Sequence, residues 1–239
     1  MAMQKTSGRN ELMWKPILSN LVEANGEIRA LHWRLHYLAF GELPEDCPDR
    51  NDASCLASFA RQEESHPFDE GSLFASMERA YRHLNLVWNC RHGPEERGRN
   101  LSGKDADRLG RFPDDADFAD LWPDGRGVKT GREMRESERK ISISPVRLGV
   151  YMANVKLESL CYLIAKKLGL DSQMKIARPD GLKPEVETRP FTESDFVRWM
   201  RRVYAELNTA WNSRRDKTFV ASRRAIVRRR CFPPDFARR

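Results

Sequence analysis

The sequence predicts an all-α protein in which two related helical hairpins pack into one four-helix core. The first observation is a repeated segment: residues 67–91 and 190–214 are identical at 11 of 25 positions, where average residue usage would give about one or two identities. The second is a pair of apolar rows at helical spacing, which begin after Pro16 and after Pro145. The third is composition, because 40% hydrophobic residues suffice for a core despite 32% charged residues.

The first element of each half is a long amphipathic helix, expected at residues 16–40 and 145–168. Apolar residues recur there at steps of four and three, and the two rows align 129 positions apart. Gly41 and Gly169 follow as stop signals, because glycine readily adopts the left-handed conformation that ends many helices. The matched apolar residues are Ile17, Leu21, Ala24, Ile28, Leu31 and Leu35 in the first row, and Val146, Val150, Ala153, Leu157, Leu160 and Ile164 in the second.

The second element of each half is a helix expected at residues 69–92 and 192–214. Met, Tyr, Leu and Trp recur at steps of four, three and four, which places them on one stripe of a helix. Asp69 and Thr192 stand just before the stripe as N-cap candidates. Both segments contain the signature Tyr-x-x-Leu-Asn-x-x-Trp-Asn-x-Arg, 123 positions apart.

The signature has a structural and a functional interpretation. Asn side chains on a packed helix would hydrogen-bond across the interface between the halves and fix its register. On a surface, the same Asn and Arg side chains would contact bases, phosphates or a partner. The structural interpretation is favoured, because a shared core most simply explains identical residues beside Trp and Tyr. The signature residues are Tyr81, Asn85, Trp88, Asn89 and Arg91 in one segment, and Tyr204, Asn208, Trp211, Asn212 and Arg214 in the other.

The predicted organisation is a first helical repeat at residues 1–118, a charged, Gly-containing linker at 119–143, and a second helical repeat with an Arg-rich tail at 144–239. The hairpins are expected to pack about an approximate two-fold axis, and two separate lobes are the alternative. The acidic stretch PDDADFADLWPD at 113–124 contains aromatic residues. It is either a docking peptide or a surface segment that covers the bundle, and the latter is favoured.

Charge is the main indication of function. Residues 195–239 hold 13 Arg or Lys against four Asp or Glu, a net charge of +9, whereas residues 1–194 carry a net −2. Phe219 and Val220 are followed seven residues later by Ile226 and Val227, so a helix here would bury one face and surround it with arginine. Guanidinium groups bind phosphate in bidentate fashion and release its counterions. The predicted phosphate contacts are Arg214, Arg215, Lys217, Arg223, Arg224, Arg228, Arg229 and Arg230.

The sequence therefore predicts a non-enzymatic subunit of an intracellular complex that binds nucleic acid, either RNA or DNA, through its basic C-terminal helix, and that contacts other protein subunits. The alternative is a helical adaptor whose Arg-rich tail docks an acidic partner. A membrane-surface helix is less favoured, because its apolar face is short and lacks Trp. The odd number of irregularly spaced cysteines, five, and the lack of a long apolar run predict a cytoplasmic protein.

No catalytic residue, metal site or cofactor is predicted. The Arg-x4-6-His pattern of helical ribonucleases occurs at Arg61–His66 and Arg29–His36, but about two chance matches are expected in such an Arg-rich chain. His32 and His36 have metal-ligand spacing, yet no Cys-x-x-Cys pair accompanies them. Phosphate-binding loops, dinucleotide glycine patterns and nucleophile elbows are missing from the sequence. A helical nuclease or toxin is the least favoured interpretation.

Overall fold

The computed structural model describes residues 12–91, 141–174, 176–179 and 181–214. These residues form helices and connecting loops, and no strand occurs among them, which confirms the predicted all-α class. The helices are α1 (Trp14–Phe40), α2 (Ala53–Ser65), α3 (Glu70–Cys90), α7 (Ile143–Leu168), α8 (Pro184–Thr188) and α9 (Glu193–Asn212). The predicted basic helix beyond Arg214 and most of the predicted linker lie outside these residues.

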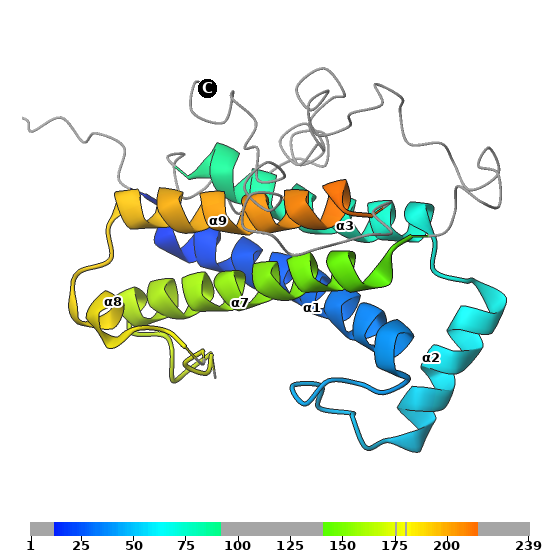
Figure 1. Cartoon of the computed structure of the whole chain (residues 1–239). Helices are drawn as coiled ribbons and strands as arrows, with labels where there is room; N and C mark the ends of the chain where they lie inside the picture. The colour runs from blue at the N-terminus through cyan, green and yellow to red at the C-terminus, as the bar shows by residue number, and fades with distance from the viewer. Residues whose placement is uncertain (1–11, 92–140, 175, 180, 215–239) are drawn as a thin grey trace, which may run out of the picture.

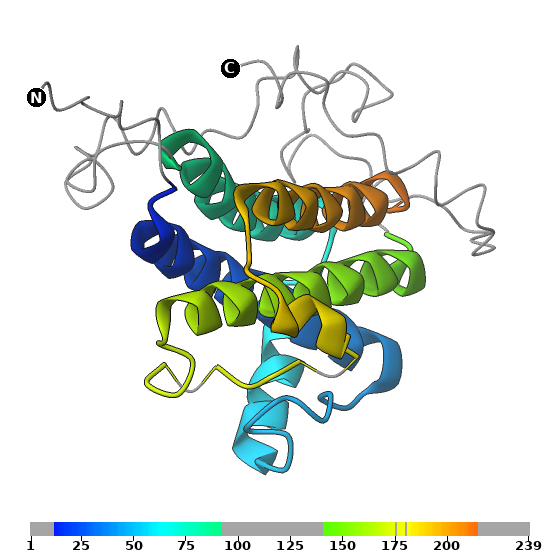
Figure 2. The same ribbon diagram turned by 90° about the vertical axis from the view of Figure 1, so that its left-hand side faces the viewer.

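The four long helices form two layers (Figures 1 and 2). Helices α1 and α7 cross in one layer, and α3 and α9 lie in the other. Helix α1 packs against both α3 and α7, and α7 packs against α9. Helix α2 extends away from this core and contains no buried residue. Within the described part of the chain, no helix is both long enough and apolar enough to span a bilayer.

The ends of the long helices are set by the residues that the sequence predicts. Gly41 and Gly169 follow α1 and α7 with φ angles of 74° and 66°, in the left-handed region that favours glycine. The Asp69 side chain accepts a hydrogen bond from the backbone N of Ser72 at the start of α3. Thr192 does the same for Asp195 at the start of α9, where the two side chains form a capping box.

The core is one continuous apolar cluster with contributions from all four long helices. Every residue of the two predicted apolar rows is buried, from Ile17 to Leu35 on α1 and from Val146 to Ile164 on α7. Burial of each large aliphatic side chain stabilises the fold by about 1.5 to 3 kcal/mol. Helical periodicity alone thus identifies the buried faces of α1 and α7.

Charged contacts join the two helices of each hairpin, with opposite polarity in the two hairpins. On the α1–α3 side, Arg79 Nε donates to Glu27 Oε2 at 2.8 Å. Burial lowers the pKa of His83 on the same helix as Arg79, and the charges of Glu23 and Glu27 act against this effect. On the α7–α9 side, Lys156 Nζ donates to Glu206 Oε1. The acid therefore lies on α1 in one hairpin and on α9 in the other.

Helices α7 and α9 approach each other most closely at Gly149. A Cβ atom added there would lie 2.8 Å from the backbone N of Ala210, closer than real Cβ contacts occur. Gly26 of α1 is also within a helix, but an added Cβ would meet no atom within 4 Å. The packing therefore requires glycine at position 149 and does not require it at position 26.

Helices α2 and α8 were not among the four helices predicted. Neither contains a buried residue, and neither forms part of the matched apolar rows from which the four long helices were predicted. The start of α2 does have a local signal, because the Asp52 carboxylate accepts a hydrogen bond from the backbone N of Ser54 at 2.7 Å. A cap without an apolar stripe is a weak indication of a helix.

Replacing Gly149 by Ala should lower the free energy of unfolding by about 1 to 3 kcal/mol, because α7 and α9 must separate to accept the methyl group. The matched control is Gly26→Ala, which should raise it by up to about 1 kcal/mol through the higher helix propensity of alanine. Urea unfolding followed by circular dichroism measures both variants. Equal effects of the two substitutions would contradict the close α7–α9 contact.

Candidate nucleic-acid interface

An exposed basic surface lies on α9, on the face that points away from the core. The helix buries Phe196 and Tyr204 on its inner stripe, so the residues between them on the opposite side face outward. Three of these are arginines, Arg198, Arg201 and Arg202, and each borders the same surface hollow. We refer to these three residues as the α9 arginine face.

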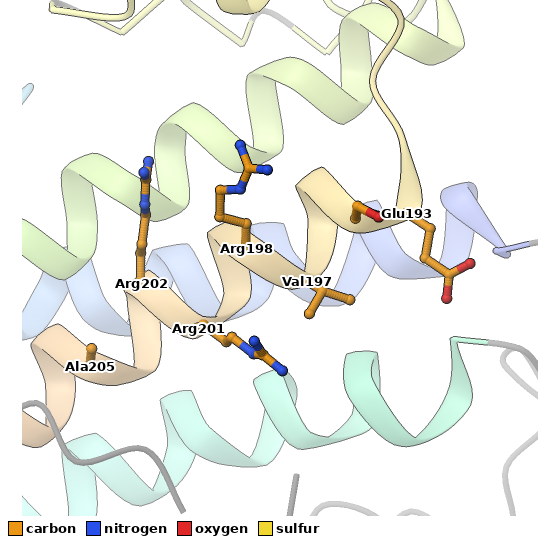
Figure 3. A pocket seen from close by; sticks show the side chains of 7 residues that line it. Glu193, Val197, Arg198, Arg201, Arg202 and Ala205 are labelled. Atoms are coloured by element: carbon orange, nitrogen blue, oxygen red, sulfur yellow. The ribbon is translucent and has the colours of Figure 1, made fainter. Parts of the chain in front are cut away.

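A hollow of about 750 Å³ lies against the α9 arginine face. Figure 3 shows Arg198 and Arg202 extending to one side of the helix and Arg201 to the other. The hollow is also lined by Glu193, Ser194, Val197 and Ala205. Three guanidinium groups within two helical turns produce a positive potential that attracts anions, and each can bind a phosphate through two parallel hydrogen bonds.

Asp195 anchors the start of α9 and lies next to the arginine face. Arg189 donates two hydrogen bonds to its carboxylate, at 2.8 and 2.5 Å, and these hold the pKa of Asp195 well below its usual range. The contact from Arg198 Nη1 to Asp195 Oδ1 is 3.9 Å, which is too long for a hydrogen bond. The Arg198 side chain therefore remains 60% exposed.

An aromatic ring adjoins the same face. The Arg202 guanidinium lies 5.3 Å from the ring centroid of Trp199, within cation–π range. Trp199 is half-buried, so part of the indole is accessible beside the arginines. Nucleic-acid-binding surfaces combine such aromatic groups, which stack on bases, with basic groups that contact phosphates.

The predicted phosphate contacts of the tail have a different placement. All of them except Arg214 lie beyond the described residues. Arg214 is buried, with a relative exposure of 5%, and its Nε donates to Glu70 Oε1 at 2.7 Å. This placement gives Arg214 a structural role between α3 and the end of α9, and it does not join the α9 arginine face.

The signature Tyr and Asn residues lie in the core, where they form two reciprocal contacts between α3 and α9. Tyr81 Oη donates to Asn208 Oδ1 at 2.5 Å, and Tyr204 Oη donates to Asn85 Oδ1 at 2.8 Å. The two phenol rings pack together, with centroids 5.4 Å apart. All four side chains are buried, so they are inaccessible to bases or phosphates.

The signature Trp and Arg residues are stacked on one another. Trp88 and Trp211 are buried, with relative exposures of 6% and 4%. The guanidinium of Arg91 lies 4.1 Å from the Trp88 ring centroid, and that of Arg214 lies 4.0 Å from the Trp211 ring centroid. The remaining signature residues are Asn89 and Asn212, whose side chains fall outside the described part of the structure.

The histidines of α1 do not form a recognisable metal centre. His32 is buried, and burial lowers its pKa. Its Nδ1 has no hydrogen-bond partner among the residues that the structure describes. His36 Nδ1 lies 2.9 Å from the carbonyl O of Glu42. In the same part of the chain, no three His, Cys, Asp or Glu side chains are grouped closely enough to hold a metal ion.

The prediction from charge did not identify the α9 arginine face. Its three arginines contribute to the +9 charge of residues 195–239, but the densest run of arginines lies further along the chain. The usable signal was helical spacing, because Arg198 and Arg202 lie four residues apart and opposite the predicted Tyr–Trp stripe. Locating charges relative to the buried stripe would have indicated this surface.

Comparison of the chain with protein-family models, with curated proteins and with solved structures returned no match. The functional assignment therefore relies on the chemistry of the chain's own surface.

Replacing Tyr81 by Phe should lower the free energy of unfolding by about 1 to 3 kcal/mol, because the buried Asn208 oxygen loses its phenol donor. Tyr204→Phe should have a similar effect through Asn85. The control is Tyr151→Phe, because the Tyr151 side chain is exposed. Chemical denaturation measures all three variants, and a Tyr81→Phe effect no larger than that of the control would contradict a stabilising role of this contact.

Alkaline pH should destabilise the fold through the same two phenols. Burial raises the pKa of both Tyr81 and Tyr204, so folding favours their neutral forms. Their contribution is fully present below about pH 10, the ordinary pKa of tyrosine, and is lost as the pH rises above it. Phenolate absorbance from these residues should appear together with unfolding. The Tyr81→Phe, Tyr204→Phe double variant should lack that component, and early ionisation in the folded state would contradict the burial argument.

Proposed function

We propose that this protein binds nucleic acid, RNA or DNA, through a basic surface formed by the α9 arginine face and the Arg-rich tail that follows it. The observation that carries the proposal is the clustering of Arg198, Arg201 and Arg202 on the outer face of α9. The chain continues from this helix into residues 215–230, which add seven further basic residues at the predicted contact positions. One element of structure thus leads directly into the most basic part of the sequence.

The spacing of the arginines suits a phosphate backbone. Arg198 and Arg202 are one turn apart on α9, so their side chains start about 6 Å from each other. Guanidinium groups at such intervals contact several phosphates, and each contact releases a bound counterion. Contacts of this kind give affinity with little sequence preference. The proposal is therefore of backbone recognition, with the accessible part of Trp199 free to stack on a base.

The protein is proposed to act without catalysis, as a subunit of an intracellular complex. The buried Tyr–Asn pairs and the Arg–Trp stacks give these signature residues a structural role. The side chains that line the α9 hollow are chiefly arginines and small residues, which are suited to binding. An adaptor that docks an acidic protein through the same surface is the second candidate, because carboxylates satisfy the same guanidinium groups.

We also propose that the chain is an internal duplication whose halves pack about an approximate two-fold axis. Reciprocal Tyr–Asn bonds between matching positions support it, as does the bond from Asn25 Nδ2 to Asn154 Oδ1 at 3.1 Å, which joins residues 129 positions apart. This is the offset of the two apolar rows. Matching backbone bonds, from Met13 N to Arg91 O and from Ser142 N to Arg214 O, add further support.

Replacing Arg198, Arg201 and Arg202 together by Gln should weaken binding to a labelled oligonucleotide, because glutamine cannot neutralise a phosphate. Each phosphate contact that the substitution removes should reduce the slope of log K against log salt by about 0.7 for a single strand and about 0.9 for duplex DNA. Fluorescence anisotropy at several salt concentrations, with single-stranded RNA, single-stranded DNA and duplex DNA, measures both quantities. Neutralising Arg223, Arg224, Arg228, Arg229 and Arg230 should have the same kind of effect through the tail.

The matched control replaces Arg50, Arg61 and Arg79 by Gln, which removes the same charge away from α9. An equal loss of affinity in both triple variants would show a general charge effect and contradict a specific surface. If the parent protein binds none of the three nucleic acids, the proposal is rejected. Capture of an acidic protein partner that depends on the α9 arginines would then favour the adaptor.

A further inference from the structure

The segment at residues 92–140 is tethered at both ends of α9. Where it begins, Trp88 near the end of α3 stacks on Phe196 in the first turn of α9, with ring centroids 6.4 Å apart. Where it ends, the backbone N of Ser142 donates to the carbonyl O of Arg214, just past the last turn of α9, at 2.7 Å. The chain therefore leaves the core beside one end of α9 and returns beside the other.

The length of this segment allows it to reach the whole outer face of α9. Helix α9 has 20 residues and is about 30 Å long. The 49 residues of the segment span up to about 160 Å when extended. Tethering at both ends of the helix gives any part of the segment a local concentration on the order of millimolar at that face. A weak attraction is therefore sufficient for contact.

The middle of the segment is chemically complementary to the α9 arginine face. Residues 113–124 contain five Asp and no Lys or Arg, whereas the face presents three arginines. The same stretch contains Phe118, Leu121 and Trp122. The hollow beside the arginines is lined in part by Val197 and Ala205, and its volume of about 750 Å³ can accept large apolar side chains.

Helix α3 lies beside α9 in the same layer, and its outer face is less suited to an acidic stretch. Glu78 occupies the position that matches Arg201 in the sequence alignment, and Ala75 occupies that of Arg198. Arg79 matches Arg202, so these three positions carry one negative and one positive charge on α3 and three positive charges on α9. At the matching positions α9 is thus the more basic of these two neighbouring helices.

We infer that the acidic stretch at residues 113–124 docks on the α9 arginine face of its own chain, with its Asp residues beside the arginines and its aromatic residues in the hollow. This contact does not depend on nucleic-acid binding. A second consequence rests on the proposed function. The Asp carboxylates would pair with the same guanidinium groups that bind phosphate, so the acidic stretch and a nucleic acid would compete for one surface.

Photo-crosslinking in the full chain tests the docking directly. A benzophenone amino acid at Trp122 should crosslink within the same molecule to tryptic peptides from residues 193–205, identified by mass spectrometry. Replacing Arg198, Arg201 and Arg202 by Gln should reduce the yield about fivefold, the change expected when roughly three surface ion pairs are removed. High salt should reduce the yield in the parent protein for the same reason.

Two controls separate docking from chance proximity. The benzophenone at Leu101, in the same segment but outside the acidic stretch, should crosslink to residues 193–205 less than position 122 does, and that yield should not depend on the α9 arginines. The Arg50, Arg61, Arg79 triple variant should crosslink from position 122 as the parent does. Crosslinks to other surfaces, crosslinks only between molecules, or a yield that is unchanged by loss of the α9 arginines would each overturn the inference.

The competition has a separate readout. Replacing Asp114, Asp115, Asp117 and Asp120 by Asn should strengthen oligonucleotide binding about fivefold or more. The reason is that roughly three ion pairs between these aspartates and the α9 arginines no longer have to break before the oligonucleotide binds. If crosslinking succeeds and affinity does not change, docking is supported and competition is rejected. If the parent binds no nucleic acid, the crosslinks still decide whether the stretch docks, and only the proposed function fails.

Discussion

The buried polar contacts that join the two hairpins within each layer are the constraint on which the arrangement of the helices depends. Tyr81 and Tyr204 each satisfy an Asn on the opposite helix, and Asn25 of α1 donates to Asn154 of α7. A buried amide without a partner costs about 1 to 3 kcal/mol. A shift of α3 along α9 by one turn would break both Tyr–Asn bonds at once. In the observed register both bonds form together, which apolar packing alone does not require.

Much of the fold could be predicted from the sequence because the relevant signals are local. Helical periodicity identified the buried stripes of α1 and α7, and Asp69, Thr192 and the two glycines marked helix ends. Helix α2 was missed because none of its residues is buried. The hydrogen-bond partners of the signature Tyr and Asn residues could not be predicted from neighbouring sequence, since Tyr81 and Asn208 lie 127 positions apart.

The candidate site uses the residue type on which the sequence prediction rests, arginine, but at other positions in the chain. A charge count correctly shows where arginines are dense along the chain, but it carries no information about which side of a helix they occupy. The same count grouped Arg214 with the tail, although that side chain lies beside Glu70 in the core. Charge becomes a guide to a surface only after the buried stripe of each helix is known, and for Arg214 the decisive neighbour is distant in sequence.

The opposite polarity of the charged contacts in the two hairpins affects how the chain folds. Two hairpins of similar sequence risk exchanging helices, a common failure when related units share one chain. In the native arrangement Glu27 pairs with Arg79, and Lys156 pairs with Glu206. By the sequence alignment, exchange would bring Lys156 to Arg79 and His83, so that the ammonium group would lose its acid and face a like charge, whereas Glu27 would meet both Arg202 and Glu206. Charge thus disfavours an exchange of helices that hydrophobic patterning alone would permit.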